Sequence, residues 1–129
     1  MSTVESDKGT TRGFGKLIVW QNVYELREKI YEITARFPKI EFRRVTQMRD
    51  AARSVKQNIQ EGHQKNSIRD YLRSLEISKG SLAEVMGDVE DCFDDQLITN
   101  GEFSELNSLC KRTAYLFDRL RQALLRKIK

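Results

Sequence analysis

The sequence has few of the residues that usually form catalytic or metal sites. Its 129 residues include one histidine and two cysteines, and they contain no Gly-rich phosphate loop and no nucleophile-elbow motif. One histidine cannot complete a usual zinc site without the cysteines. Glu61 and His63 are close enough in sequence to act as an acid and a base, but no other motif supports an enzyme. We therefore expect no catalytic residues, no metal and no cofactor.

Long apolar runs are also missing. No run approaches the roughly 20 residues that a membrane span needs, and the N-terminus has no apolar signal region. We therefore expect a cytoplasmic protein with no membrane partner. In that compartment Cys92 and Cys110, which lie at apolar helical positions, are expected to be reduced core thiols. A disulfide or a metal-binding pair is the alternative.

A single proline and 33% charged residues are typical of amphipathic helices rather than a sheet. Apolar residues recur every three or four positions through most of the chain, and Phe37-Pro38 should end the first helix. We predict an all-α domain over residues 14–129, an antiparallel up-down-up-down four-helix bundle, after a disordered tail over residues 1–13. The expected helices run from about Leu17 to Arg36, Lys39 to Glu61, Ile68 to Asp94 or Asp95, and Phe103 to Ile128.

The second helix carries three kinds of side chain on different faces. Its apolar stripe contains Val45, Met48, Ala52, Val55 and Ile59. On one flank lies a polar seam, defined as Gln47, Ser54, Asn58 and Glu61, which we expect to form hydrogen bonds that fix helix or subunit register. On the other side lies a basic flank, defined as Arg49, Arg53 and Lys56. Gly62 is expected to end this helix as a C′ residue with positive φ.

Three local features predict how the remaining helices begin and pack. Ser67 with Asp70, and Thr99 with Glu102, resemble capping boxes. Lys79 interrupts an apolar seam, so its ammonium group must reach water or an acidic partner. Gly80-Ser81 predicts a close approach of helices at that level.

The distribution of charge bears on helix packing, and the extent of apolar coverage bears on association. Residues 37–66 and 101–129 each contain seven basic and three acidic residues, whereas residues 67–95 contain three basic and eight acidic ones. Such blocks favour a defined packing order or a charged subunit contact, although solvated faces are the alternative. Several apolar residues lie outside a single seam, which favours a homo-oligomer: Ile18, Tyr24, Val85, Cys92, Leu109 and Leu116.

Four motifs occur in an order that resembles a known family. They are Leu17-Ile-Val-Trp-Gln21, Ile30-Tyr31-x-x-Thr34-x-x-Phe37-Pro38-x-x-Glu41, Gln47-x-Arg49-x-Ala51-x-x-Ser54-Val55-x-x-Asn58-Ile59-x-Glu61-Gly62, and Gly80-Ser81-Leu82-x-Glu84. This pattern resembles the S23-like four-helix-bundle proteins encoded in intervening sequences of 23S rRNA genes, over about Phe14 to Arg126.

The resemblance implies a bacterial, cytoplasmic homopentamer with no established catalytic activity. A distant relative, the accessory protein of diversity-generating retroelements, is a pentamer that binds nucleic acid and a reverse transcriptase. Nucleic-acid binding is therefore one expectation, and a scaffold for a protein partner without nucleic-acid binding is the other. The chain departs from the usual family pattern at Asp50, Lys56, Gln60 and Ser78-Lys79.

The candidate residues fall into two sets. The family-motif or interface set is Trp20, Gln47, Arg49, Ser54, Asn58, Glu61, Gly62, Gly80, Ser81 and Glu84. The candidate RNA- or DNA-binding set is Arg43, Arg44, Arg49, Arg53 and Lys56.

Overall fold

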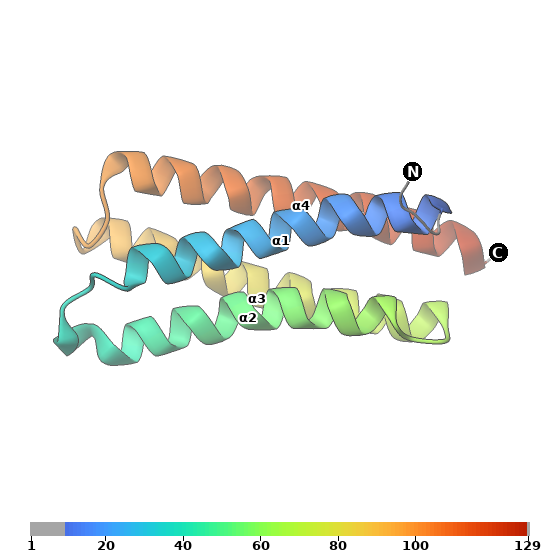
Figure 1. Ribbon diagram of the computed structural model, residues 1–129, viewed down its shortest axis with the longest axis horizontal. Helices are drawn as coiled ribbons and strands as arrows, with labels where there is room; N and C mark the ends of the chain where they lie inside the picture. Colours follow the sequence, from blue (N-terminus) through green and yellow to red (C-terminus); the bar gives the residue numbers. More distant parts are fainter. Residues whose placement is uncertain (1–9, 129) are drawn as a thin grey trace.

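The computed structural model describes residues 10–128 as helices joined by short connections (Figure 1). No residue of that range is in a strand, and the predicted all-α class is confirmed. The elements are α1 (Thr10–Thr34), the 3-10 turn η1 (Lys39–Glu41), α2 (Phe42–His63), α3 (Ile68–Asp94) and α4 (Asn100–Ile128).

The four helices form a bundle in which each helix contacts two neighbours, in the cyclic order α1, α2, α3, α4. In Figure 1 successive helices run in opposite directions, and both chain ends lie at the same end of the bundle. Two ion pairs define the register of α3 against α4. Lys79 lies 3.7 Å from Asp118, and Arg121 lies 3.2 Å from Glu76. A step of one turn toward the C-terminus of α3 therefore corresponds to a step of one turn toward the N-terminus of α4.

One apolar core fills the bundle, because every helix presents an apolar stripe toward the other three. Phe117, Leu26, Ile30, Val55 and Leu75 are fully buried in it. The predicted stripe of α2 is buried at Met48, Ala52, Val55 and Ile59. Val85, Cys92 and Leu109, which the sequence places outside a single seam, also belong to this core. They therefore give no support to association.

Both predicted caps are present. The Ser67 hydroxyl accepts a hydrogen bond of 3.0 Å from the Asp70 backbone N–H. At the start of α4 the capping is reciprocal: the Glu102 N–H donates to Thr99 Oγ1 (3.1 Å), and the Thr99 N–H donates to Glu102 Oε1 (2.9 Å). These bonds satisfy backbone donors that would otherwise have no partner at a helix start.

Helix boundaries differ from the prediction at three places. Helix α1 begins at Thr10 rather than near Leu17, so Thr10–Gly13 of the predicted tail are helical; residues 1–9 lie outside the described residues. After Pro38 the chain forms η1 before α2 begins at Phe42. Helix α4 begins at Asn100, because the Thr99 cap lies earlier than the first apolar residue.

The prediction for Gly62 is wrong. It lies buried inside the last turn of α2, and that helix continues to His63. A Cβ atom at this position would lie 2.9 Å from Tyr71 Cδ1 and 3.0 Å from Ser74 Cβ. The glycine therefore permits close packing of α2 on α3 rather than a change of chain direction. In the described residues, the non-glycine position with positive φ is Gln96, at 62°, just after α3.

Candidate functional site

The cations of the α2 basic flank are already engaged within the protein. Arg49 Nε donates to Thr34 Oγ1 (3.0 Å), its NH2 group donates to the Tyr31 carbonyl (3.1 Å), and its guanidinium lies 4.6 Å from the centre of the Tyr31 ring. Arg53 pairs with Asp50 at 2.6 Å. Lys56 Nζ lies 4.7 Å from the centre of the Trp20 ring. The flank therefore joins α2 to α1 more than it offers free charge.

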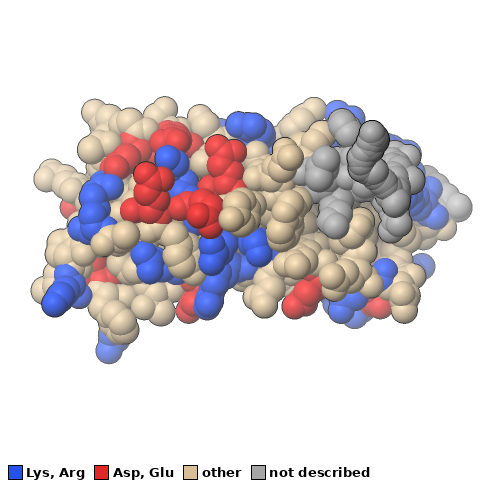
Figure 2. Space-filling model, viewed as in Figure 1, with Lys and Arg blue, Asp and Glu red and all other residues tan. Residues whose placement is uncertain are grey.

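The other two candidate nucleic-acid-binding residues differ from each other. Arg44 pairs with Glu41 (2.8 Å) and with Asp95 (2.7 Å), and its hydrogen bond to Glu41 raises the pKa of the guanidinium further. Arg43 is exposed and forms no ion pair with any residue between 18 and 128. In Figure 2 acidic side chains gather at the upper left of the face that carries α1, with basic side chains directly beside them. This part of the surface is mixed in sign, not uniformly positive.

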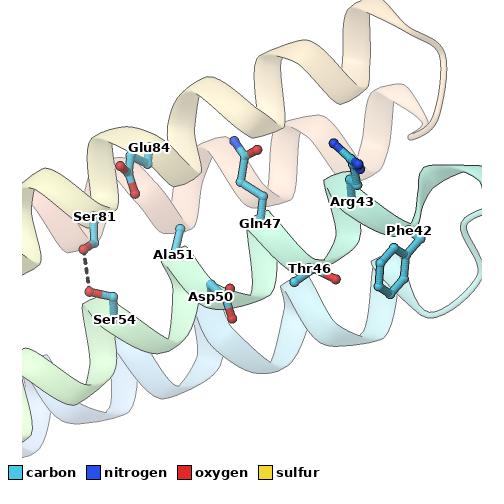
Figure 3. Close-up of a pocket in the computed structure, with 9 residues that line it drawn as sticks. All are labelled: Phe42, Arg43, Thr46, Gln47, Asp50, Ala51, Ser54, Ser81 and Glu84. Atoms are coloured by element: carbon cyan, nitrogen blue, oxygen red, sulfur yellow. Dashed lines mark hydrogen bonds between the residues drawn. The ribbon is translucent and has the colours of Figure 1, made fainter.

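Ser54 of the α2 polar seam joins α2 to α3, and Asn58 bonds to Ser54 within α2. Ser54 Oγ lies 2.7 Å from Ser81 Oγ (Figure 3). Asn58 Nδ2 donates to the Ser54 carbonyl (2.9 Å) and to Ser54 Oγ (3.2 Å). The fully buried Ser78 adds a bond of 2.7 Å from its hydroxyl to the Val55 carbonyl. These short side chains let the helices approach closely and fix their register.

The two ends of the α2 polar seam behave differently. Gln47 Nε2 donates to Asp88 Oδ1 on α3 at 3.1 Å. The Glu61 side chain is exposed, and it has no hydrogen bond or ion pair to another residue in the described part of the chain. Gly80 is exposed with no atom within 4 Å of an added Cβ. The close approach predicted for Gly80-Ser81 therefore occurs at Ser81 alone.

Asp88 is a buried acid that the sequence analysis did not single out. Its Oδ2 atom has no hydrogen-bond partner among the described residues. Burial raises the pKa of this carboxyl, and the nearby charges of Asp91 and Glu84 raise it further. The signal in the sequence was an acid between Val85 and Val89, on the apolar stripe of α3. The ionised form of this carboxyl is therefore less favourable in the folded protein than in the unfolded chain.

Replacing Asp88 with asparagine should stabilise the protein at neutral pH, by an amount of the order of 1 kcal/mol. The folded-state pKa of Asp88 lies above its unfolded value, so its stability contribution is complete below the unfolded pKa and is lost as pH rises through the folded one. The free energy of unfolding of both proteins should be measured by urea titration from pH 3 to pH 8. The two values should coincide at low pH, and as the pH rises the unmodified protein should become less stable than the variant. A constant difference across that range would contradict the assignment.

A groove runs along α2 beside α3, with a cavity volume of about 540 Å³. Figure 3 shows Phe42 at one end of it and the Ser54–Ser81 pair at the other. It contains a cation, two carboxylates and hydroxyl groups, but neither histidine nor cysteine. The lining residues are Phe42, Arg43, Thr46, Gln47, Asp50, Ala51, Ser54, Ser81 and Glu84.

The groups with the strongest intrinsic reactivity lie away from this groove. Burial raises the pKa of the Cys92 thiol to about 11 and that of Cys110 to about 12, and both are free thiols, as predicted. The His63 ring packs edge-on against Tyr71, with ring centres 6.1 Å apart.

Between residues 10 and 128 no three His, Cys, Asp or Glu residues are grouped to hold a metal ion. No helix in that same stretch has the length and apolar character to span a membrane.

The most exposed large apolar side chains were also missed. Ile40 is 89% exposed and Phe42 is 71% exposed, on either side of the junction between η1 and α2. The predicted second helix includes this segment, but neither residue belongs to its apolar stripe. The sequence does contain a signal for Ile40 and Phe42. They are two positions apart shortly after Pro38, and residues at this spacing do not share one face of a helix.

These features define a four-helix bundle in which Ser54 and Gln47 of α2 bond to α3. Residues 15–118 match the family described as 23S rRNA-intervening sequence protein. The chain belongs to this family, as the motifs predicted. No curated protein matches the sequence.

A solved structure has the same fold. It is the crystal structure of a protein from the S23 ribosomal protein family of Bacteroides thetaiotaomicron, described as having unknown function. It is 20% identical to this chain, with a TM-score of 0.77, and the alignment covers 84% of this chain and 98% of that one. At this identity the likeness concerns the fold alone.

Proposed function

We propose that the protein is a non-catalytic cytoplasmic scaffold that assembles as a homo-oligomer through the segment around Ile40 and Phe42. The exposure of these two side chains is the observation that supports it most. Complete burial of an Ile or Phe side chain is worth about 1.5–3 kcal/mol relative to exposure, and neither residue contributes that in a single chain. A second copy of the chain is the partner that covers them, and five copies is the number that the resemblance implies.

The non-catalytic part of the proposal rests on how the polar groups are used. Ser54, Asn58 and Gln47 are bonded to neighbouring residues of the bundle, and the two thiols are buried. The alternative of a nucleic-acid site on the α2 basic flank has less support, because Arg49, Arg53 and Lys56 each have an internal partner.

The double variant Ile40→Ser with Phe42→Ser should separate assembly from folding. Both side chains are exposed in one chain, so helicity should remain. Burying both side chains in the oligomer is worth about 3–6 kcal/mol per contact. Losing this free energy should raise the dissociation constant by about 10²- to 10⁴-fold. Sedimentation velocity at micromolar concentration should therefore show oligomers for the unmodified protein and smaller species for the variant.

The matched control removes the same kind of side chain elsewhere. Ile77 and Leu125 are 50% and 38% exposed on α3 and α4, and their double serine variant should sediment as the unmodified protein does. If the Ile40/Phe42 variant keeps the full mass, the proposed contact is wrong. If only the control variant dissociates, the contact lies on α3 and α4.

A further inference from the structure

Helix α4 has an outward line of arginines that the proposed assembly does not use. Arg112, Arg119 and Arg126 are seven residues apart, so they lie on nearly one line along the helix. Tyr115 and Gln122 lie beside that line at the same spacing. All five are exposed. We name this set the α4 strip: Arg112, Tyr115, Arg119, Gln122 and Arg126.

The arginines of the α4 strip have no carboxylate partner in the described part of the chain. Beyond Leu106, the single acid of α4 is Asp118, and it pairs with Lys79 on α3. Arg121, on another side of the helix, is paired with Glu76. In the α2 basic flank, by contrast, each cation is held by a group outside the flank, whereas the hydrogen-bond partner of Arg119 is Tyr115, itself a member of the α4 strip.

Tyr115 gives the α4 strip a second chemical character. Its ring is 57% exposed and has no packing role in the core. Arg119 NH1 donates to the Tyr115 hydroxyl at 3.1 Å, and its guanidinium lies 5.9 Å from the ring centre. With this contact in place, more than half of the Tyr115 surface stays exposed. An exposed tyrosine among arginines is the combination that binds a base by stacking and its backbone by charge.

We propose that the α4 strip binds a single-stranded nucleic acid, with phosphates on Arg112, Arg119 and Arg126 and a base stacked on Tyr115. At 1.5 Å per residue the arginines span about 21 Å. A line of that length fits a chain of phosphates rather than one small anion. Guanidinium groups also match phosphate geometry with two parallel hydrogen bonds. The α4 strip lies on a different helix from the proposed contact at Ile40 and Phe42, so the two proposals are independent.

The test measures fluorescence anisotropy of a labelled 20-nucleotide single-stranded RNA with the full chain. The unmodified protein should bind in the range of non-specific contacts, about 10⁻⁴ to 10⁻⁶ M. The triple variant Arg112→Gln, Arg119→Gln and Arg126→Gln should bind at least about ten-fold more weakly. Loss of three phosphate contacts should also reduce the slope of log K against log salt by about 2. Tyr115→Ala should weaken binding about five-fold or more, and Tyr115→Phe should not.

The matched control removes three charges elsewhere, by changing Arg43, Arg53 and Lys56 to glutamine. It should bind the RNA within about two-fold of the unmodified protein. An equal loss in both triple variants would show that net charge alone acts, and would overturn the proposal. So would no binding by the unmodified protein, or tighter binding to phosphatidylserine vesicles than to RNA. The mass of each variant, measured in parallel, reports on assembly separately from RNA binding.

Discussion

Replacing Gly62 with alanine is expected to destabilise the protein, whereas replacing Gly80 with alanine is expected to stabilise it. Alanine is favoured over glycine in a helix interior by about 1 kcal/mol, and both glycines lie inside helices. At Gly80 the new methyl group meets no atom within 4 Å. At Gly62 it would lie 2.9 Å from a ring carbon of Tyr71 and 3.0 Å from Ser74 Cβ.

The clash at Gly62 should exceed the gain in helix propensity. Overpacking a well-packed site costs about 1–3 kcal/mol, and Ser74 Cβ is fixed to the α3 backbone, so it cannot move aside freely. Because the propensity gain is common to both variants, the difference between them measures the clash. Urea denaturation at one fixed protein concentration should give a difference of about 1–3 kcal/mol. Equal stabilisation by both changes would contradict the close packing of α2 on α3.

Replacing Arg49 with alanine should cost about 2 kcal/mol of unfolding free energy. The change removes two hydrogen bonds from a charged donor and the contact with the Tyr31 ring. The loss is limited because both acceptors keep another bond: Thr34 Oγ1 donates to the Ile30 carbonyl (2.7 Å), and the Tyr31 carbonyl accepts from the Ala35 N–H (3.1 Å).

Arg53 provides the comparison for Arg49. Its pair with Asp50 is on the surface, with the two side chains 56% and 59% exposed, and such pairs contribute about 0.2–1 kcal/mol. Arg53→Ala should therefore change stability by no more than about 0.5 kcal/mol. Similar small effects of both substitutions in urea titrations would mean that Arg49 does not hold α1 against α2.

Local patterns in the sequence were enough to predict the helices and their caps. The predicted stripe of α2 is buried from Met48 to Ile59, with Val45 half-buried, because an amphipathic helix is stabilised by covering its apolar face. Ser67 and Thr99 act as caps because the hydrogen bonds involved span only three residues. Lys79 reaches Glu76 and Asp118, as a cation on an apolar seam must find an acid or water.

The errors came from contacts between helices. Gly62 has the sequence context of a helix end, but its neighbours Tyr71 and Ser74 come from the next helix. Arg49 was assigned to a basic surface because its partners, Thr34 and Tyr31, belong to α1. No pattern within one helix contains that information. The hydrogen-bond partner of Asp88 is likewise Gln47, on a different helix, so this contact could not be derived from α3 alone.

The most direct test of the proposed scaffold is the mass of the unmodified protein in solution. Multi-angle light scattering coupled to size exclusion, at loading concentrations from 1 to 100 μM (about two orders of magnitude, to expose any concentration dependence), measures that mass without a standard. We predict a homo-oligomer, with five times the 15.1 kDa mass of one chain as the expected value. A mass of 15.1 kDa throughout this range would contradict assembly, and Ile40 and Phe42 would then be exposed for another reason.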